Sequence, residues 1–171
     1  MTKNIVLTGF MGTGKTVTAR VLAAARKAPL FSTDTLVEEK AGKPISEIFA
    51  KDGQKAFRRL ESEVVAGLAA REGAVIDCGG GIVLNPDNVT ALKKNGVLFL
   101  LTATPELIWE RIGRQKDRPL LDVKDPLNEI RRLLKEREGY YRQTDYIIDT
   151  NGLSGESTSE AILKILDEKK L

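Results

Sequence analysis

A glycine-rich segment near the N-terminus carries the clearest chemical signal in this sequence. Residues 9–16 read GFMGTGKT and complete the pattern G-x-x-x-x-G-K-[ST] directly after the apolar run at residues 5–7. In this pattern backbone N–H groups surround the phosphates of a nucleotide. Lys15 reaches the β- and γ-phosphates, and the hydroxyl of Thr16 is available to Mg²⁺. The sequence predicts a nucleotide-binding P-loop, because an ordinary glycine-rich turn would not explain the strand before it and the helix after it.

Polar residues also follow the apolar runs that we expect to form the second and third strands. Asp34 follows the run at residues 30–32, and the triglycine at 79–81 follows the run at residues 74–78. Arg58 and Glu61 lie on a helical stretch between these two runs. Ligands of parallel sheets bind beyond the carboxyl ends of the strands, so these groups could face one cleft. The glycines would then offer close approach and N–H donors to a small oxygen-rich substrate, or else form a tight turn. Arg58 could hold an anion with Glu61 fixing its guanidinium, although spacing alone favours a surface ion pair.

The rest of the chain alternates short apolar runs with longer stretches of helical periodicity. We expect five strands, at residues 4–8, 30–32, 74–78, 97–101 and 146–149. Helices are expected at residues 14–27, 33–41, 44–50, 53–71, 87–95, 104–112, 126–144 and 156–169. This alternation predicts a three-layer α/β fold with a doubly wound parallel sheet, for which we expect the strand order 2-3-1-4-5.

Composition limits the classes of function that remain open. The 171 residues, 42% of them apolar, suffice for one globular domain spanning residues 1–171. Cys78 is the sole cysteine and the N-terminus lacks the order of a secretory signal, so we expect a cytoplasmic protein. The net charge of +3 is slight and no apolar run approaches the roughly 18 residues of a membrane span, so neither nucleic acid nor membrane is an expected partner. With no histidine, the chemistry must use Asp, Arg, Lys and a bound metal.

The polar stretch at residues 113–125 lacks clear periodicity and contains three basic residues, Arg114, Lys116 and Arg118. A P-loop kinase needs a cover that excludes water from the transferring phosphoryl group. We therefore expect this stretch to be a mobile lid. The alternative is a solvated loop, since basic loops are common.

As a set, these motifs resemble those of the shikimate kinases, and the resemblance runs from Gly9 to about Asn151. The matching segments are the P-loop, Asp34, FRRLE at 57–61, the triglycine at 79–81, RPLL at 118–121, Arg137 and the pair Tyr141-Arg142. The resemblance implies a kinase that transfers the γ-phosphoryl group of ATP to the 3-hydroxyl of shikimate, with Mg²⁺ as its cofactor. It places the enzyme in aromatic amino acid biosynthesis.

The resemblance also implies roles for individual residues. Asp34 would orient the attacking hydroxyl and accept its proton, Arg118 would meet the transferring phosphoryl group, and Lys15 would complete the catalytic set. The residues expected at ATP are Gly12, Thr13, Gly14, Lys15, Thr16, Arg111 and Arg118, with Arg111 lying against adenine beside the loop 151–155. The residues expected at shikimate, within the helical segment 33–61 and beyond it, are Asp34, Phe49, Phe57, Arg58, Glu61, Gly79, Gly80, Gly81, Arg118 and Arg137. Of these, the arginines at positions 58 and 137 would pair with its carboxylate.

One departure from the family pattern concerns the metal. The family usually has Asp where this chain has Ser32, and that Asp helps to hold the water shell of Mg²⁺. The third strand of this chain, however, ends in Asp77, which resembles the Walker-B aspartate that serves Mg²⁺. We therefore expect Thr16, Ser32 and Asp77 around the metal, with Asp77 in the carboxylate role and Ser32 as a hydrogen-bonding neighbour. In the alternative, Asp77 only caps the glycine turn, and Thr16, phosphates and water hold the metal.

Two other functions remain open on the residues alone. A small P-loop kinase acting on gluconate or a nucleoside monophosphate would share the P-loop and the lid, but paired arginines with Asp34 suit a monocarboxylate polyol better. A non-catalytic nucleotide-binding regulator would keep the P-loop and lose the acceptor and lid residues, whereas Asp34 and Arg118 are present. The expected partners are ATP and shikimate, and the expected state is a monomer, since no heptad pattern or interface stripe is visible.

Overall fold

The computed structural model of the chain describes residues 2–113 and 123–171. Arg118 and most of the predicted lid at 113–125 lie outside the described residues. Five parallel strands form one sheet in the order β2-β3-β1-β4-β5, which confirms the predicted fold and strand order. The strands are β1 (Asn4–Thr8), β2 (Leu30–Ser32), β3 (Val75–Asp77), β4 (Gly96–Thr102) and β5 (Tyr146–Asp149).

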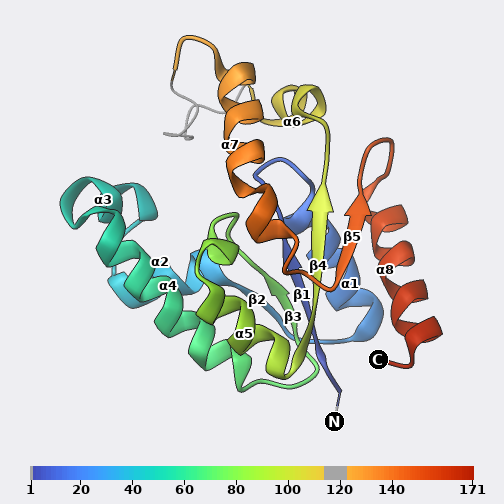
Figure 1. Cartoon of the computed structure of the whole chain (residues 1–171). Helices are drawn as coiled ribbons and strands as arrows, with labels where there is room; N and C mark the ends of the chain where they lie inside the picture. The colour runs from blue at the N-terminus through green and yellow to red at the C-terminus, as the bar shows by residue number, and fades with distance from the viewer. Residues whose placement is uncertain (1, 114–122) are drawn as a thin grey trace.

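Helices cover both faces of this sheet and give the chain three layers (Figure 1). One face is covered by α2 (Thr33–Ala41), α3 (Ile45–Lys51), α4 (Gly53–Ala69) and α5 (Pro86–Lys94), the other by α1 (Lys15–Arg26) and α8 (Gly155–Lys169). Side chains alternate across β1 accordingly, since Val6 packs toward α4 and α5 whereas Ile5 and Leu7 pack toward α1 and α8. All five residues of β1 are buried, as expected for a central parallel strand.

Two further helices stand at the edge of the sheet where the strands end, α6 (Pro105–Ile112) and α7 (Pro126–Tyr141) (Figure 1). A small apolar cluster joins them to the P-loop. Phe10 is buried there with Ile108 and Ile112 of α6 and with Ile130 and Leu133 of α7. The packing fixes α7 beside the glycine-rich loop, which matters because α7 carries Arg137.

The helix boundaries follow the predicted ones closely, and the differences are local. Helix α7 ends at Tyr141, three residues before the predicted end at residue 144. A short 3₁₀ helix, η1 (Ile82–Leu84), follows the triglycine and was not predicted, because three residues are too few to show a periodicity. Within the described part of the chain, no helix combines the length and apolar character needed to cross a membrane.

Candidate active site

The P-loop wraps back over the start of α1 through glycines in backbone conformations that other residues adopt rarely. Gly9, Gly12 and Gly14 have φ values of 140°, 78° and 93°. Gly9 also passes so close to the carbonyl oxygen of Leu101 on β4 that a Cβ atom has no room there. The ammonium group of Lys15 donates hydrogen bonds of 2.9 Å to the carbonyl oxygens of Gly9 and Phe10, which anchors it at the loop.

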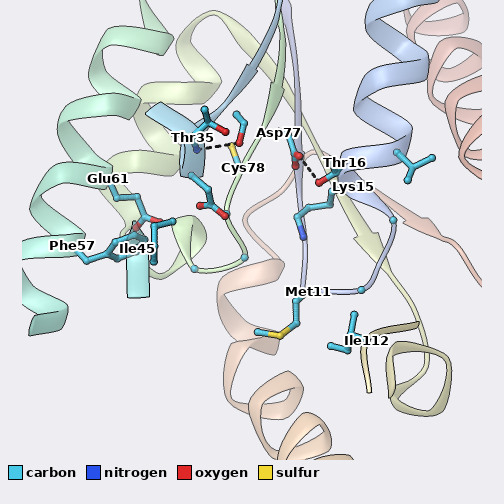
Figure 2. Close-up of a pocket in the computed structure, with 18 of the residues that line it drawn as sticks. Met11, Lys15, Thr16, Thr35, Ile45, Phe57, Glu61, Asp77, Cys78 and Ile112 are labelled. Atoms are coloured by element: carbon cyan, nitrogen blue, oxygen red, sulfur yellow. Dashed lines mark hydrogen bonds between the residues drawn. The ribbon is translucent and has the colours of Figure 1, made fainter. Parts of the chain in front are cut away.

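The hydroxyl of Thr16 donates a 2.7 Å hydrogen bond to Oδ2 of Asp77, which joins the first turn of α1 to the end of β3 (Figure 2). Asp77 is only 8% exposed. Burial raises the pKa of Asp77 above its ordinary value, and the Thr16 hydrogen bond and the charges of Lys15 and Arg20 oppose that rise. A hydroxyl and a carboxylate therefore meet beside the phosphate-binding loop, and both offer the oxygen atoms that a hard cation prefers.

Ser32 lies directly across from Asp77, since the two residues are Cα partners in the register of β2 and β3. Its side chain caps α2 by accepting a 3.3 Å hydrogen bond from the backbone N–H of Thr35. Ser32 and Asp77 both line the cleft described next.

One cleft of about 640 Å³ runs from the P-loop to the helices α3 and α4. Figure 2 shows Lys15 and Thr16 on one side of this cleft and Phe57 and Glu61 on the other. It brings together almost all of the described residues that the sequence singled out. They are Gly12, Gly14, Lys15, Thr16, Ser32, Asp34, Phe49, Phe57, Arg58, Glu61, Asp77, Gly79, Gly80, Gly81, Arg111 and Arg137.

Among the predicted residues that the structure describes, Thr13 is the one that does not line the cleft. The side chain of Thr13 is 1% exposed, and its hydroxyl donates a 2.8 Å hydrogen bond to the carbonyl oxygen of Phe10, so it braces the loop from inside. Arg118 lies outside the described residues.

Arg58 and Glu61 form an ion pair within the cleft rather than on the open surface of α4. Nη1 of Arg58 lies 2.6 Å from Oε2 of Glu61, and the Glu61 side chain is 2% exposed. Burial raises the pKa of Glu61, while the Arg58 charge and hydrogen bond lower it and the negative charge of Asp34 raises it further. The surface ion pair that spacing alone favours is therefore wrong, because the packing of α4 buries the glutamate.

The triglycine runs so close to two of these side chains that any larger residue would displace them. A Cβ atom at Gly79 would lie 2.5 Å from Oδ1 of Asp34, and one at Gly81 would lie 2.5 Å from Nη1 of Arg58. Gly80, between these two, lies against the P-loop and against Arg137 of α7. Close approach, not a positive φ angle, explains the glycines, since none of the three has one.

Arg137 reaches the same turn from α7. Its Nη1 donates a 3.3 Å hydrogen bond to the carbonyl oxygen of Gly80, and its guanidinium lies over the ring of Phe10 at 5.2 Å from the centroid. A Cβ atom at Gly80 would also approach the carbonyl oxygen of Gly9 to 3.0 Å. The P-loop, the triglycine and an arginine that could bind an anion are thus in direct contact.

Aromatic side chains form the wall of the cleft farthest from the P-loop. The rings of Phe49 on α3 and Phe57 on α4 lie 4.7 Å apart, and the Arg58 guanidinium lies 5.2 Å from the Phe57 centroid. Phe49 is nevertheless 41% exposed. An arginine stacked on an aromatic ring keeps its planar donors directed along the ring face, which suits the binding of a carboxylate.

Arg111 of α6 lies at the other end of the P-loop. It donates hydrogen bonds to the carbonyl oxygen of Gly12 at 3.1 Å and to that of Thr150 at 3.4 Å. The hydroxyl of Thr150 in turn donates to the carbonyl oxygen of Thr13 at 3.1 Å. This network ties the loop after β5 to the P-loop, at the position where the resemblance expects adenine.

Three residues with supporting roles were not among the predicted site residues. Thr33 is fully buried, and its hydroxyl accepts a 2.8 Å hydrogen bond from the N–H of Gly79. Phe10 supports Arg137, and Thr150 supports Arg111. Of these three, only Phe10 could have been found from the sequence. The P-loop pattern allows any residue at its position, so a large apolar side chain there is a signal.

Comparison with known proteins identifies the family. The shikimate kinase family profile matches residues 11–167. Shikimate kinase of Caldanaerobacter subterraneus subsp. tengcongensis is 48% identical over 95% of each chain, and that of Pelotomaculum thermopropionicum is 49% identical over 97% of this chain and 96% of its own. The solved structure of shikimate kinase from Acinetobacter baumannii in complex with shikimate has a TM-score of 0.94 at 36% identity, with coverage of 100% of this chain and 96% of that one. The predicted resemblance is confirmed, and the chain belongs to the shikimate kinase family.

Proposed function

We propose that the protein transfers the γ-phosphoryl group of ATP to the 3-hydroxyl of shikimate. The observation that carries this proposal is the grouping of Asp34, Arg58 and Arg137 around the triglycine, in the same cleft as the P-loop. Two arginines offer planar donors to a carboxylate, and the turn at 79–81 admits a hydroxyl-rich ring close to the backbone. Shikimate has both of these features.

Positioning and charge neutralisation account for most of the catalysis that phosphoryl transfer asks of a protein. Asp34 orients the attacking hydroxyl and accepts its proton as the bond to phosphorus forms. Lys15 neutralises charge on the transferring group and on the leaving ADP, and Arg118 contributes from the lid at 113–125. The backbone N–H groups of Gly12, Thr13 and Gly14 hold the phosphates, and Arg111 lies against the adenine.

The residues at the end of the P-loop fit a magnesium ion. Thr16 and Asp77 present a hydroxyl and a carboxylate 2.7 Å apart, and Ser32 lies beside Asp77 on the neighbouring strand, where its hydroxyl caps α2. Mg²⁺ is usually held by one or two such side chains together with substrate phosphates and water. When bound, it would neutralise developing charge on the β- and γ-phosphates. Thr16 and Asp77 would therefore be the residues of this chain that hold the ion at the nucleotide.

We infer that the acceptor site lies in the segment 33–61, which supplies Phe49, Phe57 and Glu61 as well as Asp34 and Arg58. The whole chain, 1–171, would act as one kinase domain. A monomeric state and a cytoplasmic location stay predictions, which size-exclusion chromatography and cell fractionation would check.

The other functions weighed above have less support. A gluconate-type kinase or a nucleotide-binding regulator would not account for the agreement of the relatives, which are shikimate kinases over 95% or more of this chain. The acceptor residues Asp34, Arg58 and Arg137, which a regulator would not need, line the cleft.

The experiment that tests the function is a coupled assay of ADP release with purified protein, ATP and Mg²⁺. Shikimate, gluconate and nucleoside monophosphates serve as parallel acceptors, and ³¹P NMR identifies the phosphorylated product. Turnover with shikimate alone is expected. Turnover with another acceptor instead would overturn the substrate assignment, and ATP binding without transfer to any of them would identify a regulator.

A further inference from the structure

We propose that Asp77 on β3 supplies the carboxylate that orders the water shell of nucleotide-bound Mg²⁺, and that Ser32 on β2 supplies no metal ligand. This inference rests on the proposed function, because it concerns the metal that accompanies ATP. It assigns the metal-supporting role to one of two side chains that lie side by side at the ends of β2 and β3. The argument comes from the position, the partners and the charge of each side chain.

The position of Asp77 places its carboxylate at the metal-binding hydroxyl. Oδ2 of Asp77 accepts the 2.7 Å hydrogen bond from Thr16, so the carboxylate lies within one water molecule of any cation that contacts this hydroxyl. The Thr16 side chain is held by a residue 61 positions away in the sequence. A carboxylate that orients a ligand in this way is typical of the groups that support metal sites.

The charges around Asp77 match those of a phosphate and metal site. Lys15 and Arg20 are the cations that act on its carboxylate, and both line the same cleft. The carboxylate is buried at 8% exposure, where interactions between charges are weakly screened. A divalent cation bound next to Thr16 would therefore gain strongly from this negative charge.

The side chain of Ser32 has a different role, that of a helix cap. Its hydroxyl accepts from the N–H of Thr35 and so caps α2, the helix whose second residue is Asp34. A hydroxyl also brings no negative charge to a cation. The cap fixes the start of α2, so Ser32 serves the acceptor side of the cleft, whereas Asp77 serves the nucleotide side.

The register of the two strands gives this inference a sharp test. Ser32 and Asp77 are Cα partners on adjacent strands, which lie about 4.8 Å apart in a sheet. A carboxylate moved from one position to the other therefore shifts by about 4.8 Å, which is less than two water diameters. An aspartate at position 32 should compensate for the loss of the one at position 77.

The experiment measures metal binding directly, without the acceptor. Mn²⁺ replaces Mg²⁺, and electron paramagnetic resonance measures its affinity for the complex of the full-length protein with ADP. In parallel, the fluorescence of a labelled ADP reports nucleotide affinity with and without Mg²⁺. The variants are D77N, D77S, S32A, the double variant S32D/D77N and the exchange S32D/D77S. D87N, at an exposed position of α5, is the matched control for the loss of one charge.

We expect D77N to weaken Mn²⁺ binding by about 10- to 100-fold, the usual effect of removing a supporting carboxylate. Nucleotide affinity without metal should not fall. S32D/D77N should recover most of the metal affinity, while S32A and D87N should retain that of the wild type. Wild-type Mn²⁺ affinity in D77N, or a loss in S32A as large as that in D77N, would overturn the inference.

Circular dichroism shows whether each variant is folded. If D77N does not fold, D77S and the exchange S32D/D77S decide: a loss of metal affinity in D77S that S32D/D77S recovers supports the inference, and wild-type metal affinity in D77S overturns it. Because no acceptor is present, a protein that binds metal and ADP as described but does not phosphorylate shikimate overturns only the proposed function.

Discussion

Gly81 and Arg58 approach each other so closely that the glycine determines where the arginine can lie. A Cβ atom at position 81 would be 2.5 Å from Nη1 of Arg58. The backbone of Gly81 itself has an ordinary φ of −102°, so an alanine would introduce no strain in the main chain. The atoms that must move are the tip of a long, flexible side chain. Substitution should therefore disturb binding while leaving the fold almost unaffected.

We expect Gly81→Ala to raise the KM for shikimate by about tenfold to a hundredfold, which corresponds to the loss of a hydrogen bond to a charged group worth about 1.5–3 kcal/mol. Unfolding in urea should change little. Gly67→Ala on α4 is the matched control, because nothing lies within 4 Å of its Cβ position. It should keep the wild-type KM and stabilise the helix by about 0.5–1 kcal/mol. An unchanged KM in Gly81→Ala would contradict the role assigned to Arg58.

The shape of the guanidinium should matter as much as its charge. Arg58→Lys and Arg137→Lys each keep the positive charge and remove the planar pair of donors that a carboxylate accepts. We expect each to raise the KM for shikimate by about tenfold, with a smaller change in kcat and none in the KM for ATP. Steady-state kinetics at saturating ATP measure this. Arg132→Lys, on the exposed part of α7, should behave as wild type. Equal effects on both substrates would mean that the cleft as a whole had been disturbed.

The alternation of short apolar runs with helical periodicity predicted the fold well, because the central strands are buried on both faces whereas the helices are buried on one. β1 shows why, since its buried residues alternate between the two apolar layers and the P-loop follows it directly. The βα order then restricts the topology to a doubly wound sheet. The helix η1 could not be predicted, because its three residues pack against the sheet without a pattern of their own.

The site was predicted less completely, because the spacing of residues in the sequence shows neither how deeply a side chain is buried nor which distant residue it contacts. Arg58 and Glu61 have the same i,i+3 spacing as an exposed pair, yet the glutamate is 2% exposed beneath the acceptor cleft. Thr33 stands at the start of α2, and nothing in the sequence marks it as the partner of a distant backbone N–H group. Its partner Gly79 lies 46 residues away and reaches it only because β2 pairs with β3.

Thr33 should be a positioning residue for the triglycine. Thr33→Val keeps the shape of the side chain but leaves the N–H of Gly79 without its acceptor, at a cost of about 1–3 kcal/mol in the free energy of unfolding. Because Gly79 lies against Asp34, the KM for shikimate should rise as well. Urea unfolding and steady-state kinetics measure the two effects. Thr33→Ser should restore both. Thr144→Val is a control whose hydroxyl donates to a backbone carbonyl outside the cleft, and it should not change the KM. Wild-type values for Thr33→Val would refute this role.

Cys78 should be inert in the folded protein although it lies beside the active-site turn. It is 1% exposed, and burial, together with the negative charges of Asp77, Glu61 and Asp34, raises the pKa of its thiol well above the ordinary value. We expect no reaction with Ellman's reagent at pH 8 until urea unfolds the chain, and then one thiol per molecule. Rapid modification of the native protein, with loss of activity, would show that the triglycine turn opens in solution.

Glu61 should make stability depend on pH in the acidic range. Burial raises its pKa in the folded state above the ordinary value of 4.5, so the folded protein holds this proton more tightly than the unfolded chain does. The resulting contribution to stability is fully present below pH 4.5 and is lost as the pH rises through the folded-state pKa. In Glu61→Gln this contribution is absent. The free energy of unfolding of the variant relative to wild type should therefore increase as the pH rises from about 4 toward neutrality, and then level off. Urea unfolding across this range measures the difference, and a difference that falls with rising pH would show that the Arg58 ion pair outweighs burial.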